Sequence, residues 1–165
     1  MAVEVREART PEEVEAAGRV TVAANAEFLP AGQLSEAWAG YLRTMADAAA
    51  RAADGTLLVA VEEPGRVVGT VTLYLEPVSE QWRRDDAMFR FLAVDPGARG
   101  RGIGRALFEA CLERARAAGK PRMALHTTEW MATARAMYER AGFRREPEGD
   151  LGVPGIAILA YAAEL

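Results

Sequence analysis

A glycine- and arginine-rich stretch at residues 99–105 is the part of the chain best suited to chemistry. It reads Arg-Gly-Arg-Gly-Ile-Gly-Arg, and it follows an apolar run at residues 89–94 and an Asp-Pro-Gly break at residues 95–97. Glycine has no Cβ, so the backbone N–H groups of such a stretch can turn toward a ligand. Apolar residues recur at 103, 106, 107, 110 and 111, which is the period of a helix. The unpaired N–H groups and the positive dipole end of that helix would therefore face whatever the stretch holds.

These properties together predict a phosphate-binding loop whose donors are mostly backbone N–H groups. The arginines add full positive charge. The predicted binding residues are Arg99, Gly100, Arg101, Gly102, Ile103, Gly104 and Arg105. A dinucleotide-binding fold would need a third glycine where Leu107 stands, and a nucleoside-triphosphate loop would need a lysine, which the stretch lacks. Both of those ligand classes are disfavoured.

The spacing of one arginine and two glycines after a Val-Asp-Pro strand end resembles the pyrophosphate loop of the Gcn5-related N-acetyltransferases (GNAT), which bind acetyl-coenzyme A. The matching residues are Arg99, Gly102 and Gly104. The resemblance implies that the loop holds the pyrophosphate and that the preceding strand end hydrogen-bonds the pantetheine arm through its backbone. The strand residues concerned are Leu92, Ala93 and Val94. It also implies that a backbone N–H, with Leu92 as the candidate, stabilises the oxyanion formed during acyl transfer.

Residues 131–143 resemble the second signature of the same family, Asn-x-x-Ala-x-x-x-Tyr-x-x-x-Gly-Phe. The matching positions are Ala134, Tyr138, Gly142 and Phe143. Met131 stands in place of the asparagine, so a polar contact that the family often makes to the coenzyme is absent. The resemblance implies that Tyr138 is the general acid that protonates the departing thiolate. Spacing alone leaves equally open a core tyrosine whose hydroxyl finds a protein partner.

His126 is the only histidine and lies in an apolar strand pattern twelve residues before Tyr138. In some relatives this strand carries a glutamate that assists deprotonation of the amine. Histidine could do so because its ordinary pKa lies near neutrality, although a structural role for a lone strand histidine is the favoured alternative. Competing bases are the acidic residues of a polar segment at residues 76–86, namely Glu76, Asp85 and Asp86.

Arg90 interrupts the apolar strand before the glycine loop. An ion pair with an acidic neighbour is favoured for it over a place in the acceptor cleft, because buried arginines are usually paired. Aromatic residues near helix ends and loops could form an acceptor pocket or simply pack. They are Phe28, Trp38, Trp82 and Trp130.

Cys111 is the only cysteine and lies on the apolar face of the helix after the glycine loop. Burial is therefore expected rather than nucleophilic work, and no intrachain disulfide is possible. A chain without disulfides fits a reducing, cytoplasmic compartment. No group of His, Cys, Asp and Glu has the spacing of metal ligands, so no metal is expected.

The composition disfavours several classes of partner. Half of the 165 residues are apolar and the formal net charge is −4, so nucleic acid is not an expected partner. The first residues form no signal peptide, and no apolar run is long enough to span a membrane. The negative net charge gives only a slight preference for a cationic acceptor.

Periodic segments separated by turn residues predict the fold class. Strand patterns fall at about residues 3–6, 57–61, 67–75, 88–94, 123–127, 143 onward and 156–162, and helix patterns at about 10–28, 35–53, 103–118 and 131–141. This order predicts a mixed α/β sheet with helices on both faces. The GNAT resemblance further implies a mostly antiparallel sheet of about six to seven strands, splayed between the fourth and fifth. We expect one GNAT domain over residues 1–165.

The resemblance implies an enzyme that transfers the acetyl group of acetyl-coenzyme A directly to a primary amine of a small molecule or peptide. A non-catalytic acyl-coenzyme A sensor on the same fold is the alternative. Segments at about residues 25–34 and 76–86 and near the C-terminus are expected to select the acceptor, whose identity stays open. Many relatives pair, so a homodimer is also open.

Overall fold

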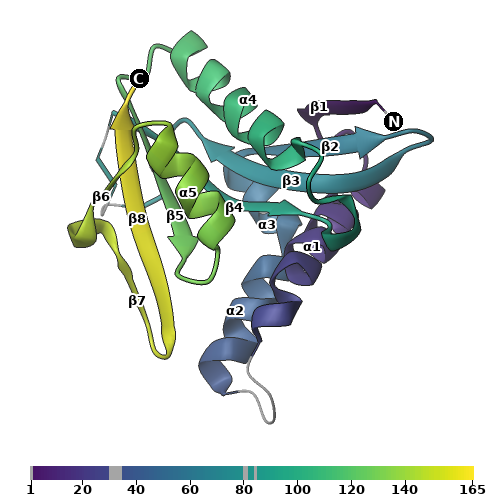
Figure 1. The fold of residues 1–165 in the computed structure, drawn as a ribbon, viewed down its shortest axis with the longest axis horizontal. Coiled ribbons are helices and arrows are strands. Elements are labelled where there is room, and N and C mark those ends of the chain that lie inside the picture. The colour runs from purple at the N-terminus through teal and green to yellow at the C-terminus, as the bar shows by residue number, and fades with distance from the viewer. Residues whose placement is uncertain (1, 30–34, 80–81, 84) are drawn as a thin grey trace.

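The computed structural model describes residues 2–29, 35–79, 82–83 and 85–165. One mixed β-sheet runs through it in the order β1-β2-β3-β4-β5-β8-β6, with β7 paired to β8 (Figure 1). The strands are β1 (Val3–Glu7), β2 (Thr56–Glu62), β3 (Arg66–Tyr74), β4 (Asp86–Val94), β5 (Arg122–Thr128), β6 (Arg144–Arg145), β7 (Leu151–Val153) and β8 (Ile156–Glu164). Within these ranges β4 and β5 form the one parallel pair, and the other neighbours are antiparallel.

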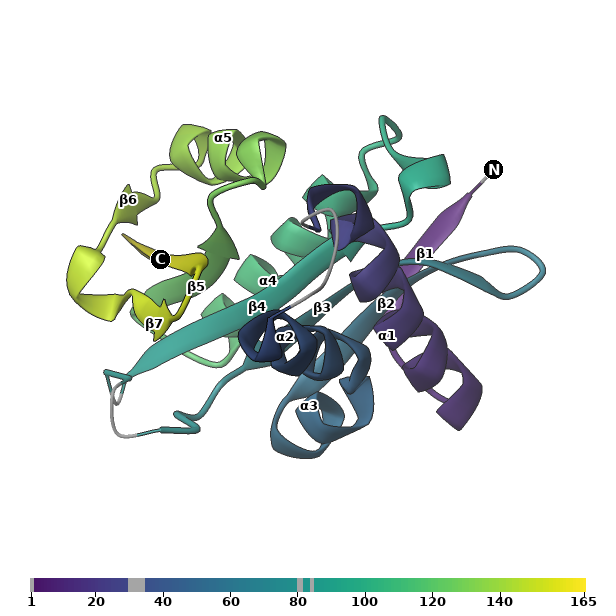
Figure 2. The same ribbon diagram turned by 90° about the horizontal axis from the view of Figure 1, so that it is seen from below.

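Helices cover both faces of the sheet. They are α1 (Pro11–Asn25), α2 (Glu36–Ala46), α3 (Ala48–Asp54), α4 (Ile103–Ala117) and α5 (Ala132–Arg140), with short 3-10 helices at Ala26–Phe28, Pro96–Ala98 and Pro147–Gly149. Figure 2 shows α1, α2 and α3 on one side of the sheet and α4 and α5 on the other. No helix in the described ranges has both the length and the apolar character needed to cross a membrane.

The side-chain alternation of β2 explains why two helical layers form. Leu57, Val59 and Val61 belong to a buried cluster with residues of α1 and α3. Leu58 and Ala60, which point the other way, belong to a larger cluster with residues of α4 and α5. Successive strand residues point to opposite faces, so a strand that is apolar at every position must be covered twice.

The predicted fold class is confirmed, with two differences in its elements. The segment predicted as one helix over residues 35–53 is two helices, because Asp47 leaves the helical conformation and its carboxylate accepts a hydrogen bond from the N–H of Ala50 (3.0 Å). Asp47 therefore ends α2 and caps α3. The sheet has eight strands rather than six to seven, because residues 151–153 pair with the start of β8.

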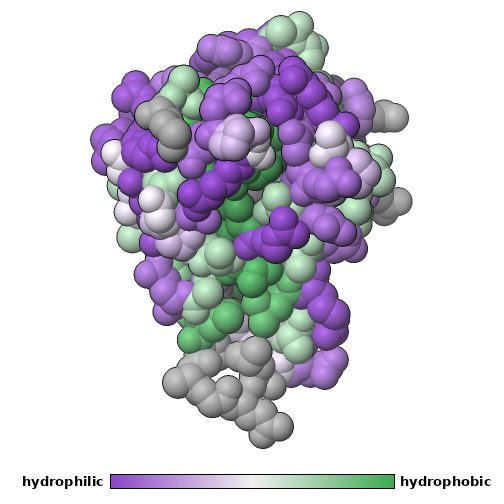
Figure 3. Space-filling view, turned by 90° about the vertical axis from the view of Figure 1, so that its right-hand side faces the viewer, coloured by the Kyte–Doolittle hydropathy of each residue, from purple (hydrophilic) through white to green (hydrophobic). Residues whose placement is uncertain are grey.

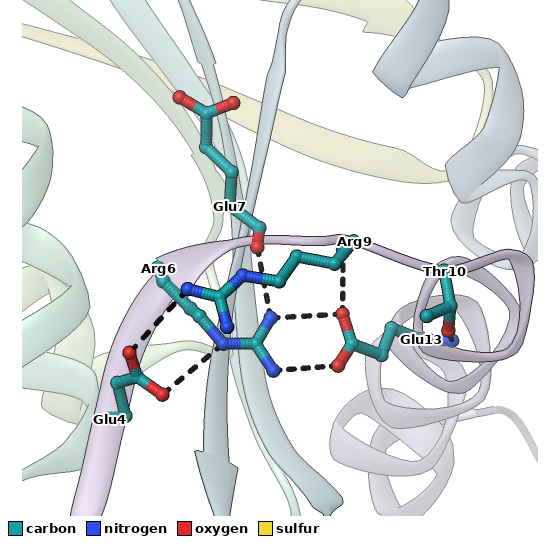
Figure 4. Close-up of polar contacts among 6 residues, drawn as sticks. All are labelled: Glu4, Arg6, Glu7, Arg9, Thr10 and Glu13. Atoms are coloured by element: carbon teal, nitrogen blue, oxygen red, sulfur yellow. Dashed lines mark hydrogen bonds and ion pairs between the residues drawn. The ribbon is translucent and has the colours of Figure 1, made fainter.

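The start of α1 matches its Thr-Pro-Glu-Glu sequence. The Thr10 hydroxyl accepts a hydrogen bond from the N–H of Glu13 (3.2 Å), and the Glu13 carboxylate accepts one from the N–H of Arg9 (2.7 Å). Figure 4 shows the Arg6 guanidinium facing the same carboxylate, with two hydrogen bonds of 2.7 and 3.0 Å. Glu13 therefore ties the helix start to β1, and hydrogen bonding from Arg6 lowers its pKa from 4.5 to about 2.

We expect Glu13→Gln to lower the Tm by about 2–4 °C at neutral pH, the shift that ~1 kcal/mol produces in a chain of this size. The folded-state pKa lies below the unfolded value, so the stabilisation is full above about pH 4.5 and is lost as the pH falls toward 2. Thermal melts of wild type and variant across this range should therefore converge in acid. Glu12→Gln, on the same helical turn, is the control. A Tm difference that stays constant with pH would contradict the assigned ion pair.

The side of the molecule that carries α1 and the β2–β3 turn has a mixed surface. In Figure 3 hydrophilic residues cover most of this face, and hydrophobic residues form a strip down its middle. Charged side chains border a hollow of ≈ 530 Å³ between α1 and the β2–β3 turn, among them Glu12, Arg19, Arg66 and Asp95.

The sheet opens between β4 and β5. Their pairing runs from Asp86 opposite Arg122 to Phe89 opposite Leu125. Beyond Phe89, β4 continues beside β3 and β5 continues beside β8. At the closed end the Arg122 guanidinium donates to Asp86 (2.9 and 3.0 Å) and to Glu146 (2.9 and 3.0 Å). This ion-pair group stabilises the paired stretch of the two strands at the end that lies away from the opening.

Candidate active site

A narrow cleft of ≈ 30 Å³ lies at the opening between β4 and β5. Its borders come from α1, α2, β4, β5, α5 and β8, and they include Asn25, Tyr41, Leu92, His126 and Tyr138. Two residues predicted to do chemistry, His126 and Tyr138, therefore share one cleft with a predicted coenzyme-binding residue, Leu92. Segments far apart in the sequence meet here, because β4 and β5 separate and the helices on both faces of the sheet border the space between them.

A bulge in β4 shapes the wall of the cleft. Thr70 of β3 is opposite Ala93, but Thr72 is opposite Arg90, so one more residue stands on β4 than on β3. Phe91 adopts φ +56° at this point, a conformation that costs a non-glycine residue about 1–3 kcal/mol. The bulge interrupts regular pairing immediately before Leu92, the candidate oxyanion donor.

The predicted phosphate loop has the conformation that its glycines suggest. Gly100 and Gly102 have φ of +77° and +76°, and apart from the adjacent residues no described residue lies within 4 Å of the position that a Cβ would take at either. Gly102 is the N-cap of α4, and the first hydrogen bond of the helix runs from the N–H of Ala106 to its carbonyl. Other N–H groups of the loop donate to no protein atom in the described ranges: those of Arg99, Gly100, Gly102, Ile103, Gly104 and Arg105.

The side chains of the loop arginines are engaged with carboxylates. Arg99 pairs with Glu27 (2.7 Å), Arg101 with the buried Glu62 (3.0 Å) and Arg105 with Glu109 (2.8 Å). Arg99 also donates to the carbonyl of Ala24 (3.1 Å). These carboxylates offset much of the side-chain charge, so the backbone N–H groups of the loop are the donors most open to an anion.

Aromatic side chains surround Tyr138. Its ring lies 5.6 Å from that of Phe89, 5.5 Å from Phe108 and 6.3 Å from Phe143, and the residue is only 2% exposed. Burial raises the pKa of its hydroxyl well above 10, so the phenol stays protonated at neutral pH. No hydrogen bond to this hydroxyl exists among the described residues, in contrast to the alternative of a core tyrosine with a protein partner.

His126 is buried at the edge of the cleft, and one hydrogen bond decides which nitrogen of its neutral ring carries the proton. Its Nε2 lies 2.8 Å from the carbonyl oxygen of Gly149. A carbonyl can only accept, so Nε2 carries the proton, and Nδ1 of the neutral ring has a free lone pair. Nδ1 is buried and has no partner among the described residues. Burial lowers the pKa of His126 below 6.5, and the positive charge of Arg90 acts in the same direction.

The competing acidic residues do not border the cleft. Asp86 begins β4 and pairs with Arg122 at the closed end of the opening. Glu76 lies 3.6 Å from Lys120, and Asp85 is exposed. His126 is therefore the residue, of the four considered, that the fold brings to Tyr138.

The favoured ion pair for Arg90 was a wrong expectation. Arg90 borders the cleft, and no carboxylate lies within 4 Å of it in the described part of the chain. Its guanidinium carbon instead lies 5.0 Å from the centre of the Phe91 ring. The alternative, a place in the cleft, is the one observed.

Aromatic residues form a group beside Asn25. Trp130 stacks on Trp38 (5.4 Å between ring centres) and on Phe28 (6.2 Å), and its Nε1 donates to the Asn25 side chain (3.0 Å). Trp82 is separate, because it packs edge-on against Tyr74. The aromatic group therefore joins the end of α1, α2 and the β5–α5 connection. Residues 30–34 of the predicted acceptor-selecting segment lie outside the described residues.

Cys111 is fully buried, as predicted. Burial raises the pKa of its thiol to about 12, so the reactive thiolate is absent at neutral pH. Within the described ranges no group of three or more His, Cys, Asp or Glu could hold a metal ion.

Sequence reasoning did not find Tyr41, Arg51 or Phe91, which the fold brings to the cleft or to its wall. Tyr41 and Arg51 lie in segments that read as ordinary amphipathic helix. No sequence pattern marks Phe91, because aromatic residues rarely adopt a positive φ. The interruption of an apolar strand by Arg90 was the one available signal.

Solved structures resemble the whole chain. An acetyltransferase of the GNAT family from Staphylococcus aureus Mu50 superposes with a TM-score of 0.73 at 18% identity, covering 99% of each chain. The PaiA N-acetyltransferase from Thermoplasma acidophilum, solved in complex with coenzyme A, gives 0.73 at 18% identity and covers 100% of each chain. At such identities the likeness defines the fold class, which is that of GNAT acetyltransferases.

The model of the Acetyltransferase (GNAT) family matches residues 21–143, and the chain belongs to this family. Glucosamine 6-phosphate N-acetyltransferase of Trypanosoma brucei brucei is 31% identical over 103 residues, 62% of this chain and 68% of that protein. Mycothiol acetyltransferase of Beutenbergia cavernae is 52% identical over 52 residues, 32% of this chain and 18% of that protein. The chain therefore spans less than a fifth of the length of this last relative.

Proposed function

We propose that this protein transfers the acetyl group of acetyl-coenzyme A directly to a primary amine. The observation that carries the proposal is a set of N–H groups at the start of α4 that donate to no described residue and lie beside a parted sheet whose cleft contains Tyr138. A diphosphate needs several donors that converge without side chains between them. Gly100 and Gly102 supply that space, because a Cβ at either position would meet no described residue other than its chain neighbours within 4 Å.

The chain's own residues can each be given one task. The loop at residues 99–105 binds the diphosphate, and the open edge of β4 at residues 92–94 binds the pantetheine arm. The N–H of Leu92 stabilises the oxyanion, a contribution typically worth about 3–4 kcal/mol of barrier. Nδ1 of His126 accepts a proton from the amine as the nitrogen attacks the thioester carbon. Tyr138 donates its proton to the sulfur as the carbon–sulfur bond breaks.

The experiment that tests the function combines binding with turnover. Coenzyme A at 100 times its Kd should stabilise the fold by about 2.7 kcal/mol, which a thermal-shift assay detects, whereas NAD and ATP should have no effect. Acetyl-coenzyme A consumption is then followed across a panel of amines. Coenzyme binding without turnover of any amine would favour a sensor, and no binding would overturn the proposal.

The proposed base makes a testable prediction about pH. The pKa of His126 lies below 6.5, so the ring is neutral and able to accept a proton above that value and loses this ability in more acidic solution. We expect His126→Gln to lower kcat/KM by about 10²-fold at neutral pH, within the range for a general base. The ratio of wild-type to variant kcat/KM should fall as the pH drops below 6.5.

The ratio cancels the effect of the amine's own ionisation, because that ionisation changes kcat/KM equally for wild type and variant. His126→Gln keeps a side chain that can donate to the Gly149 carbonyl, so the variant separates proton acceptance from packing. A ratio that is the same at every pH would contradict the base role and leave His126 as a structural residue.

A further inference from the structure

Two guanidinium groups flank one aromatic ring at the wall of the cleft. The guanidinium carbon of Arg51 lies 4.6 Å from the centre of the Phe91 ring, and that of Arg90 lies 5.0 Å from it. Arg51 comes from α3 and Arg90 from β4. Phe91 and Arg90 both border the cleft, and Tyr41, whose ring lies 6.2 Å from that of Phe91, borders it as well.

Neither arginine has a carboxylate partner within 4 Å in the described ranges. Arg51 is 94% buried, since its exposed fraction is 6%. It donates to the backbone carbonyls of Thr44 and Met45 and to the hydroxyl of Thr72, all of which are neutral. Its third nitrogen, Nη2, is buried and has no hydrogen-bond partner among the residues that the structure describes. Among the described residues, these two cations therefore have no paired carboxylate, whereas the arginines of the loop and Arg122 each face one.

The positive charges of Arg51 and Arg90 affect the pKa values of groups on both sides of the cleft. Arg90 and Arg51 both favour the ionised form of Tyr41, although burial dominates and raises the pKa of that residue. On the opposite side Arg90 contributes to the lowered pKa of His126. Burial lowers the pKa of Arg51, and Arg90 lowers it further. The carboxylate of Asp47, at the start of α3, raises the pKa of Arg51 by less than Arg90 lowers it. A guanidinium remains charged even when burial lowers its pKa from so high a value.

We propose, on the basis of the acetyl transfer proposed above, that the acceptor is an amine that also carries an anionic group, a carboxylate or a phosphate, recognised by Arg90 with Arg51 behind it. Guanidinium groups match the geometry of both anions. An anion would balance the uncompensated charge, whereas a polycationic acceptor would meet like charge. The local charge therefore outweighs the slight preference for a cationic acceptor drawn from the net charge of −4.

Binding of the anion would also position the acceptor. Arg90, His126 and Tyr138 all border the same cleft. An anionic group held at Arg90 would therefore keep the amine of the same molecule in the cleft that contains the proposed base and acid.

Matched pairs of acceptors test the proposal. An α-amino acid is compared with its neutral amide, and an amino-sugar phosphate with the unphosphorylated sugar, and a polyamine is added as the cationic case. We expect kcat/KM to be at least about 10-fold higher for the anionic member of one pair, the factor that one charge-assisted hydrogen bond provides. The pair that responds identifies the anion as carboxylate or phosphate. Equal rates within both pairs, or a preference for the polyamine, would overturn the proposal.

A variant assigns the effect to its residue. Arg90→Gln should raise the KM of the anionic acceptor about 10–100-fold, leave the KM of its neutral counterpart unchanged and change kcat little. Arg90→Lys should restore part of the loss. Arg116→Gln, at an exposed position of α4, is the matched control and should behave as wild type. An equal effect of Arg90→Gln on both acceptors would show a structural role and overturn the assignment.

Calorimetry separates this proposal from the proposed function. Protein saturated with coenzyme A is titrated with the anionic acceptor and with its neutral counterpart, and no turnover is needed. Tighter binding of the anionic compound, lost in Arg90→Gln, would support anion recognition even if no amine were acetylated. Equal binding of the two compounds would overturn it even if acetyl transfer were observed.

Discussion

Tyr138→Phe should lower kcat by about 10²–10⁴-fold, the range for a general acid, with little change in coenzyme affinity. The hydroxyl is needed only as the sulfur departs, so its loss affects the transition state rather than the bound ground state. The ring of Tyr138 packs against Phe89, Phe108 and Phe143. Phenylalanine keeps those contacts, and no protein hydrogen bond is lost in the described part of the chain.

The raised pKa of Tyr138 is compatible with acid catalysis because the same surroundings act on the leaving group. Burial keeps the phenol protonated, so the proton is present when it is needed. A thiolate expelled beside it would also be desolvated, and desolvation raises the pKa of a thiol, as burial does for the neighbouring Cys111. A leaving sulfur in this environment therefore has a high affinity for the proton that Tyr138 offers.

Tyr161→Phe is the matched control for this experiment. Tyr161 is equally buried, but its hydroxyl donates to Glu139 (3.0 Å) and accepts from Arg135 (3.1 Å). Loss of the Tyr161 hydroxyl should lower the Tm and leave kcat nearly unchanged. Single-turnover rates with saturating acceptor give the chemical step directly. An unchanged rate in Tyr138→Phe would remove this residue from the mechanism.

Gly102→Val should abolish the thermal stabilisation by coenzyme A and with it the acetyl transfer. A Cβ at Gly102 meets no described residue beyond its chain neighbours within 4 Å, so the valine side chain would occupy the space where the diphosphate is expected rather than the core. The φ of +76° adds a backbone cost of about 1–3 kcal/mol for a residue other than glycine. That cost would lower the Tm without ligand.

Gly119→Val separates the two effects. Gly119 has a φ of +74°, and a Cβ there would likewise meet no described residue beyond its chain neighbours within 4 Å, but Gly119 lies at the other end of α4. The Gly119→Val variant should be destabilised by a similar backbone cost and should keep the full thermal response to coenzyme A. Thermal shifts of both variants with and without the ligand make the comparison. A full coenzyme response in Gly102→Val would mean that the diphosphate binds elsewhere.

Local patterns predicted most of the elements, and their failures have local causes. The capping pattern at Thr10 and Glu13 gave the right start for α1, because both hydrogen bonds form within one turn. The break at Asp47 was missed since the apolar period continues through it, and aspartate stops one helix only by capping the next. Asp86, placed in the polar segment at residues 76–86 and considered as a base, begins β4 and is bound to Arg122, a partner that comes much later in the chain.

The sequence by itself determined the glycine loop, the helix that follows it, the burial of Cys111 and the placing of Tyr138 in a recognisable pattern. Each depends on contacts or dihedral angles within one or two helical turns, which residue types control directly. The tertiary structure alone decided where β4 and β5 part, how the Gly149 carbonyl directs the proton of His126, and that Arg51 and Arg90 meet at Phe91. These features join residues from separate elements, and their cost or benefit exists only once the sheet has brought those elements together.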